Sequence, residues 1–209
     1  MAVDNGNPFE QGLRTYLSPE QLAKIQSVRI GIAGAGGLGS NCAQMLVRCG
    51  FRRLTMVDFD VVEPGNLNRQ FYFLNQIGQP KVQALRENLL TINPACEIET
   101  HVTRLDQDNI TDIFVACDII VEAFDTAGCK KLIVEAFFCS DKFMVGASGL
   151  GGWGHSDRIT VHRMRHNLVL VGDMVSAATP DCPPLAPCVT VAAAKQADEV
   201  LNHVLGDMP

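Results

Sequence analysis

Short apolar runs alternate along the chain with segments whose apolar residues recur at helical spacing. The runs predict five β-strands, over 28–33, 53–58, 96–102, 118–124 and 142–147. The segments between them predict helices over 38–49, 80–93, 106–116 and 127–139. Asp106 is the expected cap of the third of these helices. Such a period of strand and helix is typical of an open, mostly parallel sheet with helices on both faces, so we expect an α/β doubly wound fold.

A short helix is predicted ahead of the first strand. Ser18 supplies an N-cap, Pro19 a first-turn proline and Gln21 a capping-box partner, and the helix is expected to run through Ile25. Because this helix precedes the sheet, residues 1–27 are predicted to form an N-terminal helical arm.

The C-terminal part of the chain extends the predicted sheet. The stretch "RITVHRM" (158–164) predicts an antiparallel strand at its edge, 179–187 a proline-rich crossing loop, and 189–205 a closing amphipathic helix. We expect residues 28–209 to form one sheet domain, because a chain of 209 residues is long enough for one well-buried core.

Composition and charge narrow the class of protein. The chain is 47% hydrophobic and 19% charged, and no segment approaches the roughly 20 apolar residues that cross a bilayer. Its formal net charge of −6 argues against a nucleic-acid partner. The first twelve residues carry two acids and no basic residue ahead of an apolar stretch, so they do not read as a secretory signal. We therefore expect a cytoplasmic protein without membrane attachment.

Eight cysteines are scattered along the chain, mostly inside apolar runs. No two of them form a C-x-x-C pair, so their spacing gives no zinc site. In a cytoplasmic chain most of them are expected to be buried, reduced thiols.

A glycine-rich turn follows the first predicted strand and opens the next helix. Gly34, Gly36 and Gly39 occupy the G-x-G-x-x-G positions, and Gly37 lies between them. Glycines let the backbone approach a ligand, and the free N–H groups at the helix start face an anion, which predicts a Rossmann-like nucleotide site. Asp58, at the end of the second strand, is placed to bind ribose hydroxyls. These features fit NAD as well as ATP.

The segment 59–79 is irregular, polar and longer than an idle connection, which is typical of a functional loop. Arg69 within it and Lys81 just after it add fixed positive charge beyond the ribose-binding acid. An enzyme that cleaves a triphosphate needs such cations to neutralise the phosphates, whereas a dehydrogenase keeps its pyrophosphate intact. The charges favour ATP cleavage, although solvated surface positions are the alternative interpretation of both residues.

Several motifs in order resemble the ubiquitin-activating-enzyme-like adenylyltransferases of the ThiF/MoeB/HesA family. They are "GAGGLGS", "VDFDVVEPGNLNRQ", "IGQPKV", "LLTINP", "EAFDTA" and "VTVAAAKQADEVL", and together they cover nearly the whole chain. Within that family the chain is most similar to the shorter ThiF proteins of thiamine-thiazole synthesis, so 28–209 is identified as a ThiF-type ATP-binding domain.

The resemblance implies a reaction and its cofactors. The C-terminal Gly-Gly carboxylate of a small ubiquitin-fold sulfur carrier protein attacks the α-phosphate of ATP-Mg²⁺, giving an acyl adenylate and pyrophosphate. Asp125 matches the magnesium-binding acid, and Arg14 matches an arginine that reaches the partner subunit's nucleotide, which implies a homodimer. A surface arginine is the alternative for Arg14. By motif position the ATP-binding residues are Gly34, Gly36, Gly37, Gly39, Asp58, Asp60, Asn66, Arg69, Gln70 and Lys81, and the catalytic residues are Arg69, Lys81, Asp125 and Arg14.

The sequence also departs from relatives. Many of them bind zinc through two C-x-x-C pairs, and since this chain has none, no metal besides Mg²⁺ is expected. Cys182 stands near the position of a cysteine that relays sulfur or the activated carrier in some relatives. No Lys, Arg or His lies in 174–194 to activate this thiol, so a bystander thiol is the alternative for Cys182, as for Cys188. Trp153, between glycines, lines the channel for the carrier tail or only plugs the end of the sheet.

Other functions stay open at this point. One is carrier binding by a basic face, formed by Arg158, Arg163 and Arg165 with two histidines, that would contact an acidic carrier. The alternative interpretation of these residues is a solvated strand edge. For the whole chain, the alternatives are a dehydratase similar to the tRNA threonylcarbamoyladenosine enzymes, a carrier adenylyltransferase of molybdopterin or cysteine pathways, and a non-catalytic carrier-binding scaffold. A hydride-transferring enzyme is the remaining one.

Overall fold

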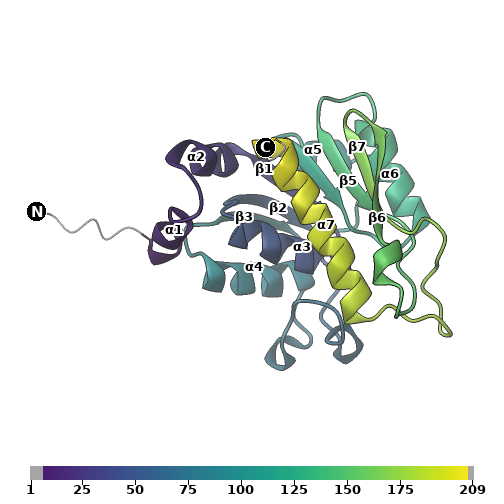
Figure 1. Cartoon of the computed structure of the whole chain (residues 1–209). Coiled ribbons are helices and arrows are strands. Elements are labelled where there is room, and N and C mark those ends of the chain that lie inside the picture. Colours follow the sequence, from purple (N-terminus) through teal and green to yellow (C-terminus); the bar gives the residue numbers. More distant parts are fainter. Residues whose placement is uncertain (1–6, 207–209) are drawn as a thin grey trace, which may run out of the picture.

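A computed structural model describes residues 7–206, and Figure 1 shows one sheet with helices on both faces. The strand order is β3-β2-β1-β4-β5-β7-β6, with every neighbouring pair parallel except β6 and β7. The strands are β1 Arg29–Ala33, β2 Arg53–Val57, β3 Glu97–His101, β4 Ile119–Glu122, β5 Phe143–Ala147, β6 Thr160–Arg165 and β7 Leu168–Gly172. The predicted doubly wound, mostly parallel fold with an antiparallel C-terminal extension is confirmed.

The helices flank the sheet in two layers, with α3, α4 and α7 on one face and α5 and α6 on the other (Figure 1). The α-helices are α1 Pro8–Leu13, α2 Pro19–Ser27, α3 Gly37–Arg48, α4 Lys81–Ile92, α5 Ile110–Ile113, α6 Ala127–Phe137 and α7 Ala186–Leu205. Within residues 7–206, three 3₁₀ turns accompany them, over Pro64–Asn66, Leu74–Gln76 and Ser156–Arg158. None of the helices in residues 7–206 is long and apolar enough to span a lipid bilayer.

The central strands are buried on both faces, which explains their nearly continuous apolar sequence. Alternate residues of β1 enter different hydrophobic clusters: Ile30 and Ile32 join the larger one with α3 and α7, whereas Ala33 joins the smaller one. Phe114 fills the second cluster opposite Gly31, where a Cβ would lie 2.6 Å from the ring. The strands form a packed platform that fixes the positions of their carboxyl ends.

The connections reverse direction at β1. After β1 the chain proceeds to β2 and β3 on one side, and then returns so that β4 pairs on the other side of β1. In open α/β sheets the ligand crevice lies outside the carboxyl ends of the strands at such a switch point. The glycine turn, which follows β1 directly, is at that position.

Three elements differ from the sequence-based expectation, and the first is α1, which was not predicted as a separate helix. The helix predicted over 106–116 is only the short α5, because the Asp106 carboxylate accepts hydrogen bonds from the Asp108 and Asn109 N–H groups and so closes a local turn. Strand β7 was not predicted; it inserts between β5 and β6 and pairs parallel with β5. Strand β6 is the antiparallel edge strand that "RITVHRM" predicts.

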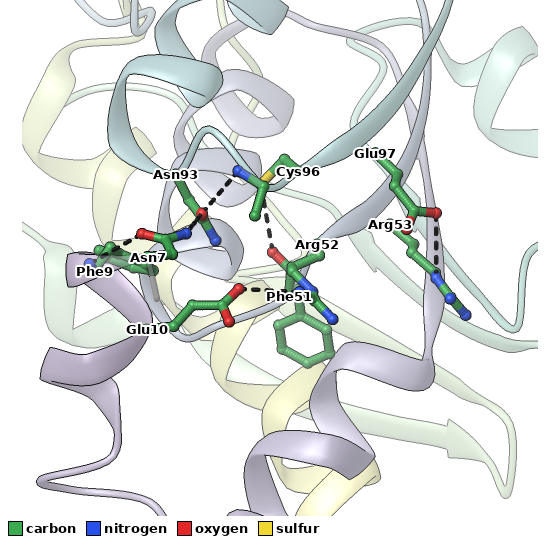
Figure 2. A network of polar contacts seen from close by, with 10 residues as sticks. Asn7, Phe9, Glu10, Phe51, Arg52, Arg53, Asn93, Cys96 and Glu97 are labelled. Atoms are coloured by element: carbon green, nitrogen blue, oxygen red, sulfur yellow. Dashed lines mark hydrogen bonds and ion pairs between the residues drawn. The ribbon is translucent and has the colours of Figure 1, made fainter. Parts of the chain in front are cut away.

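Polar contacts attach α1 to the ends of the strands opposite the glycine turn (Figure 2). Glu10 pairs with Arg52 at 3.1 Å, just before β2, and Asn7 donates to Asn93, which precedes β3. Leu13 lies against Gly50, whose φ of +107° is the left-handed conformation of a helix C-cap. The first helix therefore lies at the amino ends of β2 and β3.

The second helix has the predicted capping box, in which Ser18 and Gln21 satisfy each other's backbone N–H groups. Ile25 of this helix is fully buried in the larger cluster. Residues 1–6 of the predicted arm and 207–209 of the predicted sheet domain lie outside the described residues. The division of the chain at residue 28 stays a prediction.

Candidate active site

The glycine turn is closely packed. Gly34 has a φ of +100°, and a Cβ on Gly39 would lie 1.8 Å from the Gly34 carbonyl oxygen, so both positions need glycine. Gly36 is the N-cap of α3, and no side chain caps this helix. The N–H groups at the start of α3 are therefore available to an anion, with the helix dipole favouring negative charge.

Asp58 connects the end of β2 to this turn. Its carboxylate accepts the Ala35 N–H at 2.7 Å and the Asp60 N–H at 2.9 Å, and the residue is 7% exposed. Burial raises the pKa of Asp58, although these N–H groups and the Lys81 ammonium oppose the rise. Each oxygen keeps a lone pair for a ribose hydroxyl, so the predicted role fits the geometry and stays a prediction.

The loop 59–79 lies below the sheet in Figure 1, and hydrogen bonds join it to the start of α3. Asn41 of α3 donates to the backbone carbonyls of Gly37 and Arg69, and Ser40 accepts the Phe71 N–H at 3.0 Å. A Cβ on Gly37 would lie 3.5 Å from Cγ of Arg69. The structure thus brings Arg69 to the first turn of α3.

Sequence reasoning missed three polar residues that make these contacts. Ser40 and Asn41 directly follow the last glycine of the turn, a position that could have indicated them. Tyr72 had no such signal; it is 6% exposed, and its hydroxyl donates to the Ala35 carbonyl at 2.7 Å. All three hold the loop on the turn.

Lys81 and Asp60 form an ion pair at the start of α4. The Lys81 Nζ lies 2.8 Å from Oδ2 of Asp60, with side-chain exposures of 8% and 48%. Arg69 donates instead to the Gly65 carbonyl and to the Asn68 side chain, and lies half-buried. Both cations therefore hold acceptors that a phosphate oxygen can replace.

Asn66 and Gln70 occupy different environments in this loop. The Asn66 side chain accepts the Glu63 N–H at 3.0 Å, which supports a role in positioning the loop. Gln70 is buried, and its Oε1 has no partner within the described residues. A Cβ on Gly36 would lie 4.0 Å from Nε2 of Gln70, so this amide lies beside the anion-binding turn.

Asp125 follows β4 two residues after Ala123, which touches the glycine turn. A Cβ on Gly39 would lie 3.2 Å from Cβ of Ala123, and one on Gly34 would lie 3.1 Å from its carbonyl oxygen. The Asp125 side chain is exposed and has no hydrogen bond or ion pair within residues 7–206. An exposed, unshared carboxylate suits Mg²⁺, which takes few protein oxygens and keeps water and phosphate ligands, so the residues present fit the ion.

Arg14 lies away from this crevice. It is exposed at the C-terminal end of α1, and α1 is attached at the amino ends of β2 and β3. The Arg14 side chain has no partner within the described part of the chain. Arg14 thus lies near the amino ends of the strands, whereas the glycine turn follows the carboxyl end of β1, and the contact with a partner subunit's nucleotide stays a prediction.

A second hollow of about 360 Å³ lies beyond β5 and β7, lined by the glycine-rich segment 149–152 and by Trp153. Cys182 and Cys188 both line it, and a Cβ on Gly152 would lie 2.9 Å from Sγ of Cys182. His155 and Arg158 line the same pocket, although the sequence near Cys182 has no basic residue. The thiol relay at Cys182 stays a prediction.

The basic residues of β6 are engaged within their own chain. Arg163 pairs with Glu199 of α7 at 2.9 Å, and the Arg165 guanidinium lies 3.9 Å from the centre of the Phe138 ring. His162 bonds the Gly172 carbonyl at 3.1 Å. These contacts favour the alternative interpretation of β6 as a strand edge over a carrier-binding face.

The glycine turn at the switch point, the acid after β2 and the cations of the following loop define a protein of the doubly wound α/β class with a potential anion site at its switch point. The sequence model of the ThiF family matches residues 11–209, and the chain belongs to this family.

Curated relatives match part of the chain. The adenylyltransferase and sulfurtransferase UBA4 of Eremothecium gossypii is 38% identical over 132 residues, which cover 63% of this chain and 30% of that protein. The ubiquitin-like modifier-activating enzyme 5 of Caenorhabditis briggsae is 41% identical over 115 residues, covering 54% of this chain and 27% of that protein. The chain thus spans less than a third of the length of these relatives.

Solved structures share the fold. The E. coli tRNA N6-threonylcarbamoyladenosine dehydratase TcdA in complex with AMP has a TM-score of 0.85 at 18% identity, covering 93% of each chain. E. coli MccB with AMPCPP and MccA has a TM-score of 0.71 at 17% identity, covering 97% of this chain and 64% of that one. At these identities the likeness concerns the fold.

Proposed function

We propose that this protein is an ATP-dependent adenylyltransferase that activates the C-terminal Gly-Gly carboxylate of a small ubiquitin-fold sulfur carrier protein. The observation that carries the proposal is that the uncapped start of α3, Arg69 and the strand end before Asp125 all lie beside the glycine turn. The named activities of UBA4 and ubiquitin-like modifier-activating enzyme 5 support an activating reaction of this class.

Each residue beside the glycine turn has a separate role in the proposed nucleotidyl transfer. The N–H groups at the start of α3 and the Arg69 guanidinium bind phosphate oxygens, and Asp58 accepts from the ribose. Lys81 exchanges its bond with Asp60 for a phosphate oxygen. A carrier carboxylate oxygen forms a bond to the α-phosphorus while the bond to the β-phosphate oxygen breaks, and the fixed cations stabilise the departing pyrophosphate.

Asp125 would hold Mg²⁺ at the edge of this crevice. The ion supplies charge neutralisation to the triphosphate when bound. The Asp125 carboxylate has no competing partner within the described residues, so it needs no rearrangement before binding.

The carrier tail is assigned to the hollow beyond β5 and β7. Three of the four residues in its wall over 149–152 are glycines, which suits the close approach of a glycine-rich peptide, and Trp153 is 61% exposed beside it. Cys182 in the same hollow is the residue to which we assign a thiol relay. We also propose a homodimer in which Arg14 contacts the nucleotide of the partner subunit, since Arg14 lies near the amino ends of the strands within its own chain.

The finer assignment rests on resemblance. We assign the protein to thiamine-thiazole biosynthesis because its motifs resemble those of the shorter ThiF proteins, and we propose a cytoplasmic location. The alternatives are carriers of molybdopterin or cysteine pathways, a dehydratase that acts on tRNA, and a scaffold that binds a carrier without catalysis.

Pyrophosphate–ATP exchange separates these functions. Exchange that depends on a carrier ending in Gly-Gly supports the proposal, and the carrier that works identifies the pathway. ATP turnover that depends on tRNA establishes the dehydratase, and nucleotide binding without exchange in either case establishes the scaffold. These last two outcomes overturn the proposal.

Asp125→Ala tests the assignment of the metal-binding acid. Because its side chain is exposed and unpaired within residues 7–206, we expect loss of exchange with an unchanged midpoint of unfolding. Asp112→Ala is the matched control, since Asp112 is an exposed acid on α5, on the other face of the sheet. Near-normal exchange in Asp125→Ala contradicts the role in holding magnesium.

A further inference from the structure

We propose that Glu122, held by Lys130, is a positioning residue that fixes the backbone segment from which Asp125 projects. This inference rests on the proposed function for its consequence in catalysis. Its geometric part concerns the protein without any ligand.

The Glu122 side chain turns back onto its own segment. Glu122 is the last residue of β4 and is 4% exposed, although the strand is otherwise apolar. Its Oε1 accepts the Phe124 N–H at 2.7 Å. Asp125 follows at once, so this bond fixes the backbone direction immediately before the candidate magnesium ligand.

Lys130 ties this carboxylate to two further elements. Its Nζ lies 3.1 and 3.0 Å from the two Glu122 oxygens and 2.8 Å from the carbonyl oxygen of Ala147. Lys130 belongs to the first turns of α6, and Ala147 ends β5. The ammonium thus joins the end of β4, the end of β5 and the start of α6.

The opposite face of the sheet holds the same strand end. Gln196 of α7 is fully buried, and its Nε2 donates to the carbonyls of Glu122 at 3.0 Å and of Val145 at 3.4 Å. The ladder between β4 and β5 ends one residue before Glu122. The Gln196 amide therefore binds carbonyls at the point where the two strands separate.

Strand β5 makes room for the carboxylate. A Cβ on Gly146 would lie 3.1 Å from Oε2 of Glu122 and 2.9 Å from Leu170. Burial raises the pKa of Glu122, and the Lys130 charge and backbone N–H groups oppose the rise. Apolar side chains of similar volume often stabilise a fold as well as a buried ion pair does, so stability alone does not require this pair.

The double variant Glu122→Leu, Lys130→Met tests the role. It replaces the pair by apolar side chains of similar size and leaves neither charge buried alone, so we expect it to fold. The Phe124 N–H loses its acceptor. We expect its amide hydrogen exchange in the ligand-free protein to accelerate about tenfold or more, with an unchanged midpoint of global unfolding.

The consequence for the reaction is measured separately. We expect the Mg²⁺ concentration for half-maximal pyrophosphate exchange to rise about tenfold, the usual scale for removing a group that orients a metal ligand, with the KM for the carrier unchanged. Glu122→Gln keeps an acceptor for Phe124 and Lys130, so it should restore most of the wild-type behaviour. A structural role alone would not move the Mg²⁺ dependence.

Glu199→Leu, Arg163→Met is the matched control. Glu199 is 7% exposed and its pair with Arg163, at 2.9 Å, joins α7 to β6 away from the crevice. This control should leave Phe124 exchange and Mg²⁺ dependence unchanged. Unaltered Phe124 exchange in the first double variant, or an equal change in both, overturns the inference. If the wild type itself shows no exchange with any carrier, the proposed function fails, while amide exchange still decides whether Glu122 fixes the segment.

Discussion

Replacing Gly39 by alanine has two effects of opposite sign on the stability of the protein. Gly39 lies inside α3, where helix propensity favours alanine by up to about 1 kcal/mol. The added Cβ, however, would lie 1.8 Å from the Gly34 carbonyl oxygen, about 1.6 Å short of the 3.4 Å at which ordinary contact begins. Overpacking costs about 1–3 kcal/mol, and here backbone must move, so we expect a loss near 3 kcal/mol in the free energy of unfolding.

Urea unfolding followed by circular dichroism measures the effect, and we expect the midpoint to fall by about 1 M. Gly128→Ala is the matched control, because Gly128 lies in α6 with nothing within 4 Å of the added Cβ. This control should be as stable as the wild type or slightly more so. If Gly39→Ala is stabilised like Gly128→Ala, the Gly34 carbonyl does not approach Gly39 as closely as described. The proposed phosphate-binding geometry of the turn would then be wrong as well.

Two further predictions concern stability and local order. His203 stacks on Phe143 with ring centres 3.9 Å apart, and burial, with the nearby Lys24 charge, holds its pKa below the usual 6.5. Protonation below pH 6.5 therefore costs stability, so His203→Phe should flatten the fall in the unfolding midpoint between pH 7 and 5, and an unchanged slope contradicts this reasoning. Arg52→Met removes the ion pair with Glu10, so the backbone amides of α1 should exchange faster while the free energy of unfolding falls by about 1 kcal/mol or less. Hydrogen exchange followed by mass spectrometry measures this. Equal protection of α1 in the variant and the wild type would show that the ion pair does not anchor the helix.

The sequence predicted the fold where its signals were local. The glycine turn and the alternation of strands and helices placed β1 to β5 and β6 nearly at their observed bounds. Strand β7 was missed because an apolar run of five residues after a turn has no period that distinguishes a strand from a buried loop. The helix from Asp106 was overestimated because that side chain satisfies a local turn, which its residue type favours equally.

In the candidate site, too, the sequence indicated the residues that lie in local motifs and missed those that only tertiary packing brings together. Motif order indicated Asp58, Arg69 and Lys81, although their roles stay predictions. Gln196 binds the carbonyl of Glu122 across 74 positions of sequence, and no local pattern links such a donor to its acceptor. Tertiary packing alone brings such groups together. It also places the basic residues His155 and Arg158 in the same pocket as Cys182.

The position of α7 has a consequence for the rigidity of the glycine turn. This helix of 20 residues is about 30 Å long, and Val189 in its first turn packs against Gly37, where a Cβ would lie 2.9 Å away. Further along, Gln196 and Val200 anchor it in the core. Because α7 is held both at its first turn and further along, the glycine turn beside it would keep its shape if residues 173–185, which precede the helix, moved.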